Sequence, residues 1–132
     1  MRSDGQSLYS PSWETVVPGT FKCGCTPSKC DGLTPDARIL QSAVVYNNHL
    51  FVYGGTGGSL GSKVSASLYS FDLKQGGGWH KIEQKSTSTL PPPGRSGATT
   101  NIVAHSTMLL FGGQGSAESS TREMLSDMYV VF

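Results

Sequence analysis

Residues 38–55, RILQSAVVYNNHLFVYGG, and residues 95–113, RSGATTNIVAHSTMLLFGG, follow the same plan. Each stretch begins with an Arg, continues through two apolar segments separated by a turn, and ends with Gly-Gly. Arg38 and Arg95 lie 57 positions apart. A repeat of this length cannot bury its apolar faces alone and has to stack on copies of itself. The repetition therefore decides the fold class, and it favours a binding scaffold over a dedicated enzyme.

Further residues recur at nearly the same spacing. The pair Gly54-Gly55 returns 58 positions later as Gly112-Gly113, and Tyr69 returns 60 positions later as Tyr129. We expect the glycines to stand where a side chain would block the neighbouring backbone. We also expect the large rings that follow, Tyr69 and Trp79, to fill the space that the glycines leave open.

The first copy reads as four short antiparallel strands. The apolar, β-branched composition of QSAVVY predicts a buried strand, and Asn47-Asn48 suits the positive φ angles of a tight hairpin turn. The sequence WHKIE alternates apolar and polar side chains, as expected for a half-exposed outer strand. The four strands are predicted at 41–46, 50–53, 66–71 and 79–83, with a Gly/Ser loop at 56–65.

The second copy follows a polar, proline-rich connection at 84–94 that is predicted not to be a strand. Its strands are predicted at 97–103, 108–111 and 127–132, with a loop at 114–125. A fourth, Trp-bearing strand is missing. The only other such segment, Trp13 to Val17, lies near the N-terminus and resembles the outer strand of a preceding blade.

Together, the Arg, the hairpin, the Gly-Gly pair and the spaced Tyr and Trp resemble kelch repeats. The resemblance implies an all-β fold of kelch-type β-propeller blades, each a four-stranded antiparallel sheet, in rings of about six blades. It assigns structural motif roles to both halves. The residues concerned are Arg38, Gly54, Gly55, Tyr69, Trp79, Arg95, Gly112, Gly113 and Tyr129.

The chain thus divides into four parts: an N-terminal tail (1–12), an outer strand with a long Cys-containing loop (13–37), a first repeat (38–94) and a second repeat without its last strand (95–132). Two blades are too few for a ring, because propellers typically have four to eight. We expect a fragment of a larger propeller, a truncated product, or a subunit that completes its ring by self-association.

The composition points to no charged partner. Ten Lys and Arg residues balance nine Asp and Glu residues, so nucleic acid and membrane surfaces are not predicted as partners. We expect a soluble protein of the cytoplasm, with the nucleus as an alternative, because no signal-peptide segment opens the chain. The three cysteines, Cys23, Cys25 and Cys30, are too few for a usual zinc site unless Asp31 or a distant His joins them. Free thiols are the preferred interpretation, a metal site is the alternative, and no cofactor is predicted.

The long connections indicate where a partner would bind. Successive antiparallel strands place the connections between the second and third strands, and between one repeat and the next, on one face of the propeller. We call it the loop face, and long loops on a rigid scaffold commonly carry recognition. Its charged contributors are predicted to be Lys22, Lys29, Lys63, Lys85, Glu118, Arg122 and Glu123.

No catalytic residue is predicted. The segment GGTGGSLGSK at 54–63 lacks the Gly-Lys-Ser/Thr of a phosphate loop, and the nucleophile pattern G-x-S-x-G does not occur. His49, His80 and His105 are expected at a strand start, on an outer strand and in a hairpin turn. The resemblance implies a non-catalytic protein-interaction scaffold, for example a substrate adaptor, a cytoskeletal binder or a trafficking factor. The alternative is part of a kelch-like enzyme, a copper oxidase or a sugar-acting propeller.

Overall fold

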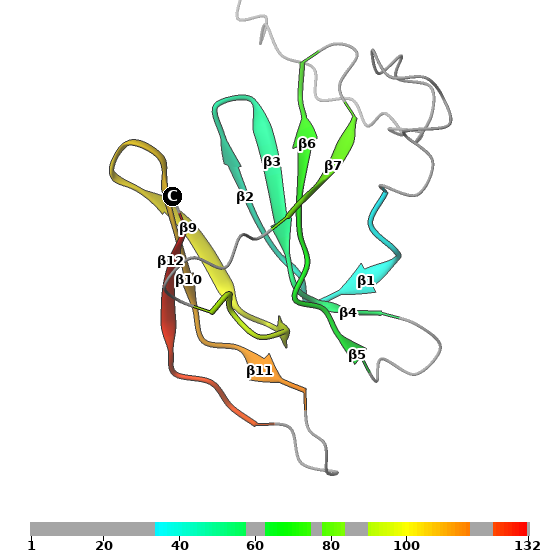
Figure 1. Ribbon diagram of the computed structural model, residues 1–132, viewed down its shortest axis with the longest axis vertical. Coiled ribbons are helices and arrows are strands. Elements are labelled where there is room, and N and C mark those ends of the chain that lie inside the picture. The colour runs from blue at the N-terminus through cyan, green and yellow to red at the C-terminus, as the bar shows by residue number, and fades with distance from the viewer. Residues whose placement is uncertain (1–33, 58–62, 75–77, 84–89, 117–122, 132) are drawn as a thin grey trace, which may run out of the picture.

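The computed structural model describes residues 34–57, 63–74, 78–83, 90–116 and 123–131. The described part consists of two antiparallel sheets side by side, with smaller two-residue strands at one end (Figure 1). Within it, the only helical segment is a single 3-10 turn, Ala104–Ser106, and no helix is long and apolar enough to cross a membrane. The predicted all-β class is confirmed.

The first sheet has four strands in the order β2-β3-β6-β7. They are β2 (Ser42–Tyr46), β3 (His49–Tyr53), β6 (Leu68–Asp72) and β7 (Trp79–Ile82). The register pairs Tyr46 with His49 across the first hairpin. Asn47 and Asn48 have φ angles of 45° and 61°, as the sequence predicts for a turn of this kind.

The second sheet repeats this plan with three described strands in the order β9-β10-β12. They are β9 (Thr99–Val103), β10 (Thr107–Phe111) and β12 (Met128–Val131). The 3-10 turn joins β9 to β10, so His105 lies in a hairpin turn as predicted. The predicted strand of Trp13 lies outside the described residues.

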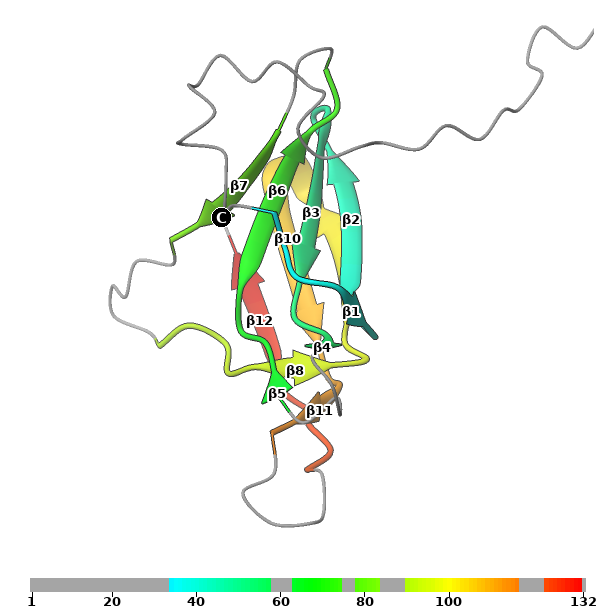
Figure 2. The ribbon, with the colours of Figure 1, turned by 90° about the vertical axis from the view of Figure 1, so that its right-hand side faces the viewer.

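Five two-residue strands lie at one end of these sheets (Figure 2). Strand β4 (Thr56–Gly57) pairs with both β1 (Arg38–Ile39) and β5 (Lys63–Val64), and β8 (Arg95–Ser96) pairs with β11 (Gln114–Gly115). The interpretation of 56–65 and 114–125 as plain loops was therefore wrong in part. Their ends are anchored, because a neighbouring connection supplies each with hydrogen-bonding partners that a sequence pattern of period two cannot reveal.

The hydrophobic core lies between the two sheets. Its buried members are Tyr53, Leu68, Met108 and Leu110, and the last of these has no exposed surface. The first strands of the two sheets, β2 and β9, lie against each other. Each sheet thus buries one apolar face against its sibling, which is the stacking that the repeat predicts.

The opposite faces of the two sheets are less covered. Phe111, Met128 and Val130 share the outer face of the second sheet and are 51%, 62% and 47% exposed. On the first sheet, the outer face carries Tyr69 and Trp79, whose rings meet edge to face with centroids 6.4 Å apart. The strand alternation places the two aromatic rings on the side of their sheet that faces away from the second sheet.

Candidate functional site

The end of the molecule that carries the two-residue strands is the predicted loop face. The β2–β3 and β9–β10 hairpins lie at the opposite end of the sheets (Figure 1). The connections between repeats and those between the second and third strands of a sheet meet on the loop face. Strand β1, just before β2, pairs with β4, just after β3. Strand β8, just before β9, pairs with β11, just after β10. The described part of the loop face is therefore a framework of hydrogen-bonded backbone.

Backbone hydrogen bonds also join the two repeats at the loop face. The amide of Gly55 donates to the carbonyl oxygen of Arg95 at 2.9 Å, and the amide of Arg95 donates to the carbonyl oxygen of Ser65 at 3.2 Å. A third bond runs from the amide of Gly97 to the carbonyl oxygen of Leu40 at 2.8 Å. These bonds connect the segment before β9 with the segments before β2 and between β3 and β6. They fix the relative position of the two repeats at this end.

The Gly-Gly pair lets backbone segments approach closely at this end, and Gly54 admits the backbone of the second repeat. A Cβ atom at Gly54 would lie 2.4 Å from the carbonyl oxygen of Arg95, and one at Gly55 would lie 2.9 Å from that of Ile39. Both glycines have positive φ angles, 70° and 86°. The expectation that Tyr69 and Trp79 fill the space beside the glycines was wrong. Backbone of neighbouring connections fills it, since the three nearest atoms to a Cβ on Gly54 are all backbone atoms.

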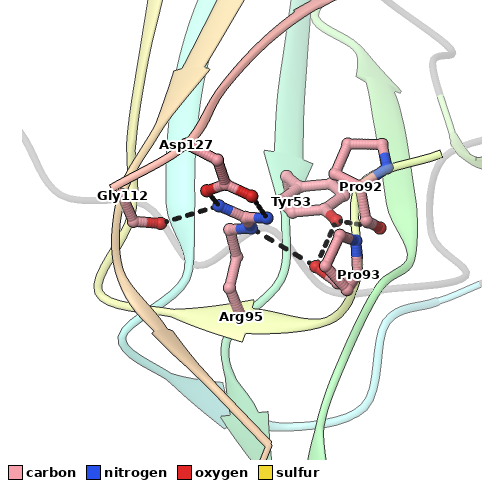
Figure 3. A network of polar contacts seen from close by, with 6 residues as sticks. All are labelled: Tyr53, Pro92, Pro93, Arg95, Gly112 and Asp127. Carbon is pink, nitrogen blue, oxygen red and sulfur yellow. Dashed lines mark hydrogen bonds and ion pairs between the residues drawn. The ribbon is translucent and has the colours of Figure 1, made fainter. Parts of the chain in front are cut away.

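Arg95 is the centre of the polar network beneath the loop face (Figure 3). Its side chain is fully buried and its guanidinium faces the ring of Tyr129 at 5.1 Å from the centroid. Nη1 donates to the carbonyl oxygen of Gly112 at 3.0 Å, and Nε donates to that of Pro93 at 3.3 Å. The carboxylate of Asp127 accepts from both Nη1 and Nη2, which makes a two-pronged ion pair.

The charges of this network change the pKa values of its members. The hydrogen bond from Arg95 holds the pKa of Asp127 below its ordinary value, and the same bond raises the pKa of Arg95. Tyr53 lies beside them, and its hydroxyl donates to the carbonyl oxygens of Pro92 and Pro93 at 2.9 and 3.2 Å. Burial raises the pKa of Tyr53 to about 12, against the opposing charge of Arg95. The network is thus held in one charge state across neutral pH.

Arg38 occupies the same place in the first repeat. Its Nη1 donates to the carbonyl oxygen of Gly54 at 2.9 Å, and its Nε donates to that of Asp36 at 3.1 Å. Its guanidinium faces the ring of Tyr69 at 5.2 Å from the centroid. The two arginines therefore make the same three contacts, although Arg38 is only partly buried. Sequence analysis assigned both arginines to the repeat motif. It missed that Arg95, alone of the two among the described residues, has a carboxylate partner, Asp127.

Few of the predicted partner-binding residues fall on described positions. Glu123 is exposed on the loop face, where its carbonyl oxygen accepts a hydrogen bond from the amide of Gly115 at 2.9 Å. Lys63 begins β5 on the same face. Lys22, Lys29, Lys85, Glu118 and Arg122 lie outside the described residues, as do Cys23, Cys25 and Cys30. No cluster of three metal-binding side chains occurs in the described ranges.

The family comparison agrees with this architecture. A family model described as the Kelch motif matches residues 37–87. Residues 37–87 are therefore a kelch repeat. The matched residues run from just before Arg38 to beyond β7, so the kelch motif coincides with the complete four-stranded sheet. The second sheet follows the same kelch plan in its Arg, its hairpin, its Gly-Gly pair and its Tyr.

Comparison with solved structures supports the same fold. The chain matches 42 chains of solved structures. One of them, titled "Structure of YjhT", superimposes with a TM-score of 0.52 at 19% sequence identity, covering 74% of this chain and 25% of that one. The likeness is one of fold, and the chain spans a quarter of the length of that structure. No curated protein matches the chain.

Proposed function

We propose that this chain is a non-catalytic protein-interaction module that binds a partner through its loop face. The observation that carries the proposal is the anchoring of both long connections by two-residue strands at one end of the blades. Anchoring holds the described ends of the connections in place before a partner arrives, which lowers the entropic cost of binding. The β2–β3 and β9–β10 hairpin turns at the opposite end are only two and three residues long.

The kelch repeat supports this proposal through its architecture alone. Stacked repeats expose a continuous surface at each end of the blades, and such surfaces suit the recognition of other proteins. The chain spans 25% of the length of the YjhT chain, so a partner would bind it as one part of a larger surface. We further propose that the protein works in the cytoplasm and needs no cofactor. Metal analysis of the purified protein tests the enzymatic alternative, since stoichiometric copper or zinc would favour it.

The test is affinity capture with the full chain as bait, followed by mass spectrometry. The Lys63→Glu and Glu123→Lys variants reverse charges on the loop face, and Lys74→Glu is the matched control, since Lys74 is exposed beyond β6 at the opposite end. Partners bound by the loop face should be lost with the first two variants and retained with the control. Retention with all three variants would contradict the proposal.

A further inference from the structure

A short proline segment, Leu90-Pro91-Pro92-Pro93, lies in the connection between the two repeats and leads into β8 on the loop face. The ring of each proline fixes its φ angle at about −65°. Leu90, Pro91 and Pro92 each precede a proline, which excludes the α-helical conformation and favours an extended one. None of the described peptide bonds is cis. The segment therefore forms a turn of polyproline II helix.

The exposure of this segment follows the period of that helix. A polyproline II helix has three residues per turn and hence three edges. Pro92 forms the one edge that is buried. Leu90 is 80% exposed, and Pro91 and Pro93 are also exposed. Because Leu90 and Pro93 are three residues apart, they share one exposed edge, and Pro91 lies on the other. The segment thus turns one edge towards the protein and two edges towards solvent.

Hydrogen bonds fix the buried side of the segment to the core between the two sheets. Tyr53 belongs to that core, and its hydroxyl donates to the carbonyl oxygens of Pro92 and Pro93 at 2.9 and 3.2 Å (Figure 3). Nε of Arg95 donates to the carbonyl oxygen of Pro93 at 3.3 Å. These bonds determine which side of the polyproline II helix faces the protein. Its two exposed edges are therefore held in one orientation before any partner binds.

We infer that Leu90, Pro91 and Pro93 form a docking site for a domain that receives polyproline II helices in an aromatic-lined groove, as SH3 and WW domains do. Such grooves favour a rigid helix, because it loses little conformational entropy on binding. The two exposed edges supply apolar surface to pack between aromatic rings. Residues 90–94 carry no charged side chain, so shape and apolar contact decide what binds there.

An array of purified SH3 and WW domains, probed with the full chain, tests the inference. At least one domain should bind the chain, and Leu90→Ala and Pro91→Ala should each weaken that binding about tenfold or more. Leu73→Ala is the matched control, since Leu73 is 47% exposed just after β6, at the opposite end of the sheets. It should bind as the wild type does. Binding to no domain of the array, or equal binding by all three variants, would overturn the inference.

A free peptide separates the folded segment from its sequence alone. Acetyl-Leu-Pro-Pro-Pro-Gly-amide, with the sequence of residues 90–94, should displace the chain from the domain that binds it. The chain should bind that domain at least as tightly as the peptide does, because the hydroxyl of Tyr53 already holds the helix in place. A domain that binds the peptide and not the chain would contradict the inference, since the two edges would then be inaccessible in the folded protein.

The inference rests on the proposed function in placing a protein partner on the loop face, and it adds the class of domain that the partner carries. The two can fail separately. If the charge reversals at Lys63 and Glu123 abolish partner capture while the array shows no binding, only this inference is wrong. If a domain of the array binds and depends on Leu90 and Pro91 while the charge reversals leave capture intact, the docking site stands and the wider loop-face proposal is wrong.

Discussion

The carbonyl oxygen of Arg95 lies over Gly54, so close that a Cβ atom at position 54 would come within 2.4 Å of it. This contact joins the two repeats, because Gly54 ends the first hairpin and Arg95 opens the approach to the second sheet. The adjacent hydrogen bond from the amide of Gly55 to the same oxygen holds the contact in place. A glycine at position 54 is therefore a requirement of packing between the two repeats.

Substitution of Gly54 by Ala should destabilise the chain more than the same substitution at Gly97. Both glycines have positive φ angles, 70° and 68°, so the backbone strain is alike. Only position 54 adds a backbone clash, since a Cβ atom at Gly97 meets nothing within 4 Å. We expect losses of about 1 kcal/mol for Gly97→Ala and about 3 kcal/mol or more for Gly54→Ala, measured by urea unfolding. Equal losses would contradict a role of Gly54 in packing between the repeats.

Asp127→Asn should make the chain less stable at neutral pH and less sensitive to acid. The pKa of Asp127 is lowered by Arg95, so its stabilising effect is present above its ordinary value of 3.8 and is lost as the pH falls through the lowered pKa. The carboxylate is 38% exposed, so solvent screening limits the loss to about 1–2 kcal/mol. Urea unfolding at pH 7 and at pH 3 measures it, with the exposed Glu123→Gln as control. The prediction is wrong if the wild type and Asp127→Asn have the same pH dependence below pH 4.

Tyr53→Phe should remove the hydrogen bonds to the Pro92 and Pro93 carbonyls and cost about 1–2 kcal/mol. The pKa of Tyr53 is raised from 10.0 to about 12, so its neutral form is favoured in the folded state. That contribution is complete below pH 10 and is lost as the pH rises towards 12. Thermal unfolding between pH 8 and pH 11.5 should therefore show a steeper alkaline decline in the wild type than in Tyr53→Phe. Parallel declines would show that Tyr53 is not held neutral by burial.

Trp79→Ala should severely destabilise the first sheet. The indole packs against Tyr69 and against Phe71, whose ring centroid is 5.1 Å away. Complete burial of a Trp is worth about 3–5 kcal/mol, and the partial exposure of Trp79 places the expected loss near the lower end, about 3 kcal/mol. Leu90→Ala is the control, because Leu90 is 80% exposed. An unchanged melting temperature for Trp79→Ala would show that this aromatic cluster contributes nothing to folding.

Local pattern alone allowed the strands and the first turn to be predicted from sequence. The apolar run before Asn47-Asn48 and the alternation after Trp79 both have the period of a strand, and both became strands within one or two residues of the expected bounds. The recurrence of Arg, Gly-Gly and Tyr indicated two equivalent sheets. Such features depend on side chains near one another in sequence, which is why they are visible without coordinates.

The tertiary structure alone decided what the repeated residues contact. In the sequence, Arg38 and Arg95 have the same position in the repeat and are assigned the same structural role. No sequence pattern identifies Asp127 as a partner of Arg95, because Asp127 lies 32 positions later and meets it only when β12 joins the second sheet. The glycines were expected to make room for rings and instead make room for backbone, which at Gly54 belongs to the other repeat. Periodicity determined that the chain builds two sheets of one kind. Long-range packing decided that one arginine is neutralised within the chain while the other has no described carboxylate partner, because an ion pair depends on distance in space and not on position in the repeat.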